Sequence, residues 1–203
     1  GYAYYKDTIL VEQRDYLANT SYSRIGACQL DASIDYISTP EDLMNVSNGC
    51  YVLENNIDLS GINWTPIVDF NGVLDGNGFE IQNLSIFNIL DANAEGYFGI
   101  GLFDNAYGTI MNLGLTDYSI IVIDLGSLNY NINVGSLAGS SNGNILNTYT
   151  IGSIITHRLG DPSIGSLTGR SSGYIANVYT KGTIYFNSLD TLYVGGIAGS
   201  ING

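Results

Sequence analysis

The chain alternates short apolar pieces with glycine and small polar residues along most of its length. In residues 134–154 (VGSLAGSSNGNILNTYTIGSI), pieces of four to seven residues rich in Ile, Val, Leu, Thr and Tyr lie between glycines. That length and composition favour β-strands, and regularly placed glycines favour corners where φ is positive or two backbones approach closely. The pattern therefore predicts an all-β protein made of many short strands.

The same pattern recurs at a spacing of thirty residues. Residues 164–184 (IGSLTGRSSGYIANVYTKGTI) match residues 134–154 at 12 of 21 positions, and residues 194–203 (VGGIAGSING) match the start of that segment at seven of ten. Residues 101–112 and 70–86 fit the template more loosely. Self-similarity at such a period indicates stacked units. We therefore expect each repeat to form one coil of a right-handed parallel β-helix, or β-solenoid.

Stacked coils would bring equivalent residues into columns about 4.8 Å apart. The expected stacking ladders are an aliphatic column of Leu137, Leu167 and Ile197, an amide pair of Asn147 and Asn177, and a tyrosine pair of Tyr149 and Tyr179. Such ladders reinforce in-register parallel sheets. The sequence leaves open which side of the strand at residues 147–150 faces the core, because both sides carry apolar residues.

The corners have a distinctive form, which occurs as GSLAG, GSLTG and GGIAG. These residues, with the preceding segment from Ile37 to Ile86, resemble the GLUG-motif repeats of bacterial and archaeal surface adhesins and of secreted immunoglobulin-cleaving proteases. The resemblance covers residues 37–203. It implies a GLUG-type parallel β-helix and an extracellular or cell-surface location, and it implies no substrate.

Both ends of the predicted solenoid need a cover, because an exposed terminal coil offers unpaired backbone to other strands. Thr39 as N-cap, Pro40 at the first helical position and acids in the first turn predict a short capping helix over residues 40–46. Residues 1–36 form an N-terminal extension, which is a second cap or a donor strand. The sequence stops at Gly203 within a new repeat, so either further repeats or another copy would cover the last coil.

The charge balance bears on the partners. Six Lys and Arg stand against nineteen Asp and Glu, for a net charge of −13. Nucleic acid is disfavoured, because phosphate neutralisation needs clustered basic side chains. No apolar run is long enough to span a bilayer, so we expect no membrane insertion. Self-association into a homopolymer, further repeats of a longer chain, and a glycan or host-surface ligand remain as predicted partners.

Two further features fit an extracellular setting. Cys28 and Cys50 are the only cysteines, and they are compatible with either one disulfide or two buried thiols. Asn-x-Ser/Thr sequons make glycosylation candidates of Asn19, Asn45, Asn63 and Asn83. A chain so rich in Asn, Ser and Thr also produces sequons by chance.

Motifs for catalysis, cofactors and metals are not found. His157 stands alone in THRLGDPS, which we expect to be an exposed loop, and no helical zinc motif or phosphate-binding glycine loop occurs. Asp58, Asp69 and Asp75 could cluster on neighbouring coils, but acids at turns usually bond nearby backbone. Calcium at these acids and polysaccharide cleavage are weaker interpretations.

The sequence therefore predicts no catalytic, cofactor-binding or metal site. It favours a non-enzymatic extracellular structural or adhesive β-solenoid, with head-to-tail assembly into a surface filament through the N-terminal segment as its specific form. The alternative is a carbohydrate-binding or polysaccharide-degrading β-helix protein.

Overall fold

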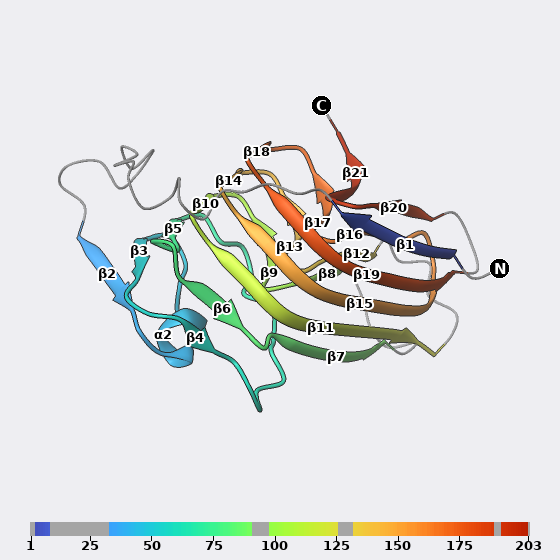
Figure 1. The fold of residues 1–203 in the computed structure, drawn as a ribbon, viewed down its shortest axis with the longest axis horizontal. Helices are drawn as coiled ribbons and strands as arrows, with labels where there is room; N and C mark the ends of the chain where they lie inside the picture. Colours follow the sequence, from blue (N-terminus) through green and yellow to red (C-terminus); the bar gives the residue numbers. More distant parts are fainter. Residues whose placement is uncertain (1–2, 9–32, 91–97, 126–131, 189–191, 203) are drawn as a thin grey trace.

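The computed structural model describes residues 3–8, 33–90, 98–125, 132–188 and 192–202. Within these ranges the chain is almost wholly β-strand, arranged in four sheets, with a single five-residue helix (Figure 1). Nearly all strand pairs are parallel. The expected all-β class with parallel strands is therefore confirmed.

Each sheet contains strands that are far apart in the sequence. The longest has the order β1 (Ala3–Thr8), β19 (Tyr179–Ser188), β15 (Tyr149–Leu159), β11 (Gly114–Asp124), β6 (Glu80–Gln82) and β4 (Ile57–Asp58), with β7 (Ser85–Leu90) also pairing with β11. The second has the order β18 (Tyr174–Ala176), β14 (Asn144–Leu146), β10 (Thr109–Met111), β5 (Val73–Asp75), β3 (Cys50–Leu53) and β2 (Ile34–Ile37).

Two shorter sheets complete the fold. The third has the order β20 (Tyr193–Gly195), β16 (Ser163–Gly165), β12 (Ile132–Gly135) and β8 (Phe98–Ile100). The fourth has the order β21 (Ala198–Ile201), β17 (Thr168–Ser171), β13 (Ala138–Ser141) and β9 (Phe103–Ala106). A strand of the third sheet is followed, after a two-residue turn, by a strand of the fourth.

Successive stretches of chain add one strand to each sheet. The unit of residues 132–159 contributes β12 to β15, and the unit of residues 163–188 contributes β16 to β19. Their strands pair with a shift of thirty residues, as Ile145 with Ile175 and Tyr149 with Tyr179 show. Residues 193–201, called the last unit below, contribute β20 and β21.

Helix α2 (Pro40–Met44) begins where the sequence predicts and ends two residues earlier than the predicted Val46. Thr39 Oγ1 accepts a hydrogen bond from Asp42 N at 3.1 Å, and Asp42 Oδ2 accepts one from Thr39 N at 2.9 Å. This reciprocal capping box satisfies two N–H groups at the helix start. Leu43 is the buried residue of the helix and joins the main core.

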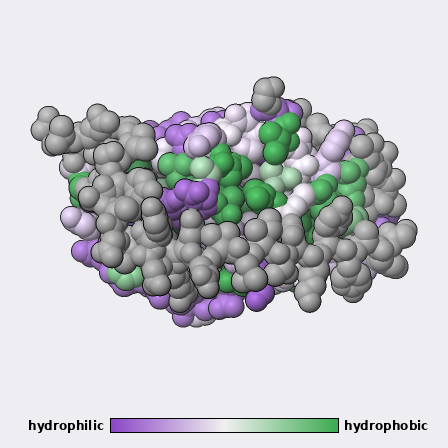
Figure 2. All heavy atoms as spheres, turned by 45° about the horizontal axis from the view of Figure 1, so that its top comes forward, coloured by the Kyte–Doolittle hydropathy of each residue, from purple (hydrophilic) through white to green (hydrophobic). Residues whose placement is uncertain are grey.

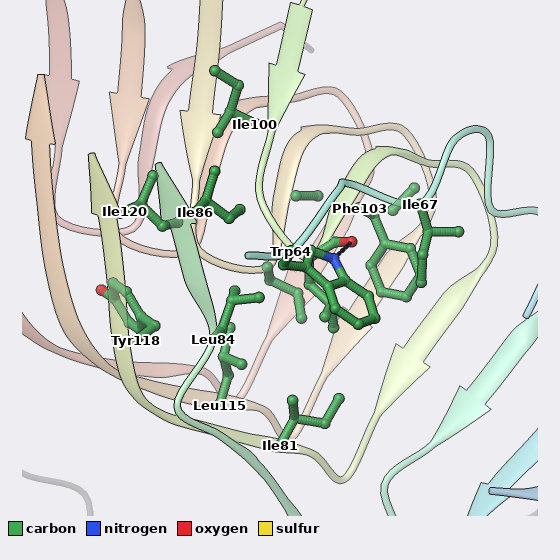
Figure 3. Packing of buried hydrophobic residues seen from close by; sticks show 14 of the residues in the cluster. Trp64, Ile67, Ile81, Leu84, Ile86, Ile100, Phe103, Leu115, Tyr118 and Ile120 are labelled. Atoms are coloured by element: carbon green, nitrogen blue, oxygen red, sulfur yellow. Dashed lines mark hydrogen bonds between the residues drawn. The ribbon is translucent and has the colours of Figure 1, made fainter. Parts of the chain in front are cut away.

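One hydrophobic core runs through the stack. Figure 3 shows side chains from several units meeting in it, among them Trp64, Phe103 and Tyr118. The Trp64 Nε1–H donates to Leu102 O at 3.0 Å, which satisfies the polar atom of a side chain that is 2% exposed. Phe70 and Phe103 lie 4.8 Å apart between ring centroids.

The glycine-framed corners join the third and fourth sheets. A Cβ atom on Gly139 would lie 2.2 Å from Gly99 Cα, and one on Gly135 would lie 2.4 Å from Thr168 Cα. No side chain fits at these distances, so the two glycines allow backbones of neighbouring strands to touch. Leu137, between them, is fully buried. The GSLAG pattern is thus a close-packed corner.

Strand β1 has an unexpected position. It pairs antiparallel with β19 of the same chain, from Ala3 opposite Phe186 to Thr8 opposite Lys181. In Figure 1, β1 in dark blue lies beside β19, whereas β2 lies at the opposite end of the molecule. β2 itself pairs in parallel with β3 and spans the boundary placed at residues 36/37 from the sequence.

Candidate functional site

A row of hydrogen-bonded amides runs along the outside of the stack. Asn177 Nδ2 donates to Asn147 Oδ1 at 3.1 Å, and Asn147 Nδ2 donates to Asn112 Oδ1 at 3.1 Å. Asn112 Nδ2 in turn donates to Asp75 Oδ1 at 3.0 Å. The three asparagines have φ between 49° and 54°. Asparagine suits these positions for two reasons. It tolerates the left-handed region of φ, and its side chain carries both a hydrogen-bond donor and an acceptor.

The other expected ladders are placed as follows. Leu137 and Leu167 are fully buried, and Ile197 of the last unit is partly buried against the same core. Tyr149 and Tyr179 are paired in register in the long sheet. The Tyr149 hydroxyl donates to Glu80 Oε1, so this tyrosine reaches across Gly114 to a carboxylate two strands away.

The structure shows which side of the strand at residues 149–159 (β15) faces the core. Thr148 and Thr150 are buried, whereas Tyr149 is half-buried. The core side of this strand therefore begins with threonine, and the larger aromatic residue packs over the sheet on its outer side. His157 belongs to β15 and is exposed there, so the expectation of a loop at this residue is wrong.

The acids considered for catalysis have structural partners. Asp58 accepts hydrogen bonds from Ser60 N at 2.9 Å and from Asn83 Nδ2 at 2.8 Å. The Asn83 bond, followed by those of Ser60, holds the pKa of Asp58 below its usual value. Asp75 accepts from Asn77 N at 2.8 Å as well as from the amide row. The carboxylates of Asp58 and Asp75 thus accept hydrogen bonds from turn backbone and from asparagine side chains.

A polar groove of about 320 Å³ is lined by residues of the third and fourth sheets and of the segments that directly follow the fourth-sheet strands. Its walls carry amide, hydroxyl and charged side chains from four successive units. The lining residues are Gly99, Asp104, Asn105, Asn133, Ser140, Asn142, Arg170, Ser172 and Asn202. The sequence analysis did not single out any of them as a site.

The groove has a regular construction. Asn105, Ser140 and Arg170 occupy equivalent positions on β9, β13 and β17, and Ser200 follows them on β21. Across the groove, Asn133 Nδ2 donates to Ser140 Oγ at 3.0 Å. On the rim, the Ser172 hydroxyl donates to Asn142 Oδ1. Each unit therefore contributes a similar set of polar groups.

Asp104 departs from this regularity. Its register places it opposite Gly139, in the column that contains glycine at 169 and 199 in later units. Its carboxylate lies against Gly99, where a Cβ would be 2.1 Å from Asp104 Oδ1. A glycine column interrupted by a carboxylate is the one signal in the sequence that could have identified this site.

Electrostatics make Asp104 unusual among the described acids. Partial burial raises the pKa of its carboxyl above the usual value, and the nearby Asp69 charge raises it further, while a hydrogen bond from the Gly99 N–H opposes both. Asp69 also accepts a hydrogen bond of 3.4 Å from Asn105 Nδ2. At the other end of the groove, the Asn202 amide oriented with its oxygen toward Arg170 accepts from Nε at 2.8 Å.

The cysteine and sequon predictions fall partly outside the described residues. Cys50 is 4% exposed and is disulfide-bonded rather than free, whereas Cys28 lies outside the described residues, so their pairing stays a prediction. Asn19 also lies outside them. Asn45 Nδ2 donates to Glu41 O at 2.7 Å, Asn83 bonds Asp58, and Asn63 Oδ1 accepts from Phe87 N at 2.9 Å.

No three His, Cys, Asp or Glu side chains in the described ranges are grouped so as to hold a metal ion. The described helix is too short and too polar to cross a bilayer.

Comparison with known proteins gives limited matches. No family model matches the chain. Over 136 residues, 67% of this chain, it is 31% identical to Halomucin of Haloquadratum walsbyi, and the match spans 1% of the length of that protein. A solved structure described as a "putative immunoglobulin A1 protease" from Bacteroides ovatus is similar at 18% identity and a TM-score of 0.46, over 84% of this chain and 62% of that one.

Proposed function

We propose that this chain is a structural module of an extracellular or cell-surface protein, built as a right-handed β-solenoid and without catalytic activity. The observation that carries the proposal is the repeated in-register pairing of its sheets, interrupted between these units only near the end of β15, at His157/Leu159. Strands of the 132–159 and 163–188 units pair at equivalent positions in all four sheets. Such a stack is stabilised mainly by contacts between neighbouring units, which suits a rigid spacer or scaffold.

The side-chain rows support a structural role. Neighbouring units contact each other through side chains as well as backbone, in the amide row and in the buried aliphatic column. Acids that could serve in catalysis are instead bonded to turns and to asparagines. Helix α2, with Leu43 buried in the core, is the proposed cap of the first unit.

The relative named Halomucin supports a surface or secreted location. It also supports the interpretation of the chain as one module among many, because the match spans only 1% of that protein. The disulfide-bonded Cys50 fits the same location, since disulfides persist mainly in oxidising compartments.

Assembly through β1 is the specific form of the proposal. β1 adds main-chain hydrogen bonds to the edge of β19, and 25 residues separate Thr8 from Ile34 at the start of β2. That number of residues can extend over about 80 Å, whereas β2 and β18 are five strand positions apart, about 24 Å. The same pairing therefore forms within one copy or between two, as in domain swapping.

Apolar side chains are exposed on the edge strands β18, β20 and β21 of the described stack. Tyr174, Tyr193 and Ile201 are exposed by 64%, 53% and 75%. Figure 2, which brings the top of Figure 1 forward, shows hydrophobic residues (green) beside hydrophilic ones (purple) on this face. Exposed apolar side chains on edge strands favour association.

A cysteine cross-link tests whether β1 is exchanged. Lys6 and Thr183 are paired in register across β1 and β19. Protein carrying only Lys6→Cys is mixed with protein carrying only Thr183→Cys, at high concentration and under mild oxidation. We expect a covalent dimer on non-reducing gels, because the pair can then meet only between copies.

The matched control is Ser119→Cys with Ser153→Cys, a pair in register between β11 and β15 that must cross-link within one chain. Electron microscopy of the wild-type protein shows whether exchange produces filaments. If the mixture yields no dimer while Lys6→Cys/Thr183→Cys in one chain yields a cross-linked monomer, assembly through β1 is wrong and β1 is a cap of its own chain.

A further inference from the structure

The polar groove between the third and fourth sheets has the chemistry of a binding site. Its volume of about 320 Å³ falls at the lower end of the range for small-molecule sites, about 300–1,000 Å³. Unlike most such sites it is lined by amides, hydroxyls and charges. An occupant must therefore carry many hydrogen-bonding groups of its own to replace the water that these side chains bind.

The charges in the groove limit the class of ligand. Among the lining residues, Asp104 lies toward one end and Arg170 toward the other, and the charge of Asp69, which is not a lining residue, acts on Asp104. Arg170 faces the neutral amide of Asn202, which accepts its hydrogen bond when the amide oxygen is oriented toward it. An anionic ligand would meet the carboxylates, and the chain has a net charge of −13, so phosphate-rich or uronic ligands are disfavoured.

The walls of the groove also argue against a peptide. Peptides commonly bind as an added strand at a sheet edge, with main-chain hydrogen bonds and pockets for alternate side chains. Here the walls are the faces of strands that are already paired, as β13 is with β9 and β17. Asn133 and Ser140 present side chains rather than backbone groups.

The repeat places polar side chains along the groove at a regular spacing. Asn105, Ser140 and Arg170 follow one another at the strand spacing of about 4.8 Å. One sugar unit of an extended glycan has a similar length. Successive units can thus present one set of amide or hydroxyl groups to each sugar, with donors and acceptors for neutral hydroxyls.

Asp104 is the residue at which the groove departs from the repeat, and its carboxylate accepts a hydrogen bond from the Gly99 N–H. Glycine occupies the equivalent position in the next three units, at 139, 169 and 199. A carboxylate there is partly desolvated and lies near a second carboxylate. Residues that break a local structural rule at a cost are often functional, and a carboxylate accepts strong hydrogen bonds from adjacent hydroxyls.

We propose that this groove binds a neutral oligosaccharide segment, with Asp104 and Arg170 as the main hydrogen-bonding residues and Asn105, Asn133 and Ser140 between them. Asp104 accepts hydrogen bonds from sugar hydroxyls, and the Arg170 guanidinium donates to them. This binding site goes beyond the structural role and does not depend on exchange of β1.

The test measures binding of wild-type protein to immobilised neutral, uronic-acid-containing and sulfated oligosaccharides, followed by calorimetry with the best ligand. We expect binding to one group of neutral oligosaccharides. Asp104→Gly, which restores the repeat glycine, and Arg170→Ala should each weaken that binding by about tenfold or more. Circular dichroism and thermal unfolding check that each variant is folded.

Asp35→Asn on β2 and Lys181→Ala on β19 are the matched controls, because both residues are exposed and lie outside the groove. They should leave the affinity within about twofold of wild type. The proposal is overturned if no neutral oligosaccharide binds at millimolar concentration, if acidic ones bind better, or if folded Asp104→Gly and Arg170→Ala variants bind like wild type.

Discussion

The interior units and the last unit carry nearly the same residues in different surroundings. Val134 and Ile164 are fully buried, whereas Val194 at the equivalent position is only partly buried. Leu137 and Leu167 are fully buried, whereas Ile197 packs against the core with part of its surface exposed. The burial of a residue in this fold is therefore completed by the unit that follows it.

This difference implies that stability is a sum of unit and interface contributions. Identical substitutions should cost more in an interior unit than in the last one. Urea unfolding measures this difference, with the midpoint shift interpreted at constant m.

The largest expected difference concerns corner glycines. In Gly135→Ala, the new Cβ would lie 2.4 Å from Thr168 Cα of the next unit, and backbone cannot yield easily. We expect a loss of about 3 kcal/mol or more. In Gly195→Ala, the new Cβ would lie 1.9 Å from Ala198 O of its own unit but would meet no backbone of a following unit within the described residues, so this corner can shift and a loss of about half that size is expected.

A control for the glycine comparison is Gly61→Ala. Gly61 has φ +78° and no atom within 4 Å of a built Cβ, so only backbone strain of about 1 kcal/mol applies. Equal losses in Gly135→Ala and Gly61→Ala would show that the corner does not depend on close approach.

The second prediction concerns the aliphatic column. Leu167→Ala removes a fully buried side chain and should cost about 3 kcal/mol, from lost burial and the cavity left behind. Ile197→Ala should cost about 1 kcal/mol, because its side chain is partly exposed and the site can relax. Similar losses for the two variants would contradict the view that the following unit completes the burial.

The amide row gives a smaller effect. Asn147→Ala removes one donated and one accepted side-chain bond and puts alanine at φ 49°, so we expect a loss of about 2 kcal/mol. Asn177→Ala puts alanine at φ 53° as well but removes only one, exposed side-chain bond, so it should cost less, about 1.5 kcal/mol.

Asn147→Gly separates the two causes. Glycine tolerates positive φ, so the loss that remains in this variant measures the hydrogen bonds alone. If Asn147→Gly is as stable as wild type, the amide row contributes no stability and asparagine is needed only for its backbone conformation.

Two buried hydroxyls offer a gain in stability. Ser141 Oγ and Ser171 Oγ are buried without hydrogen-bond partners. Ser171→Ala removes the desolvation cost of an unpaired hydroxyl, so we expect the free energy of unfolding to rise by about 1 kcal/mol. A loss of stability in this variant would mean that a water molecule or another group satisfies the hydroxyl.

The smallest effect is a dependence on pH. Because the folded-state pKa of Asp104 is raised, the folded protein binds more protons than the unfolded chain between the two pKa values. Stability should therefore fall as pH rises through the unfolded pKa of Asp104, and no further above the folded one. Asp104→Asn should flatten this part of the curve, and an unchanged slope in that variant would show that another group titrates.

Some of the structure follows from local sequence alone. The spacing of Gly135, Gly139 and their equivalents at thirty residues indicates stacked parallel strands, because strand length, turn residues and period all agree there. The helix start at Thr39 and Pro40 is equally local, since capping involves residues three positions apart. These features depend on neighbours in the chain or on exact repetition.

Other features required the tertiary structure. The antiparallel pairing of β1 with β19 joins residues almost 180 positions apart, and no repeat predicts it. Tyr149 reaches Glu80, and Asp104 meets Gly99 and Asp69, through contacts between units or sheets whose alignment the sequence pattern does not specify.

The sequence by itself thus determined the strand-rich repeat, its corners and its helix start, because each depends on local backbone preferences repeated along the chain. Only the tertiary structure decided where the groove forms, that the pKa of Asp104 is raised, and that β1 pairs with the edge of β19. These arise where different units meet, and the relevant residues are those in which one unit departs from the next.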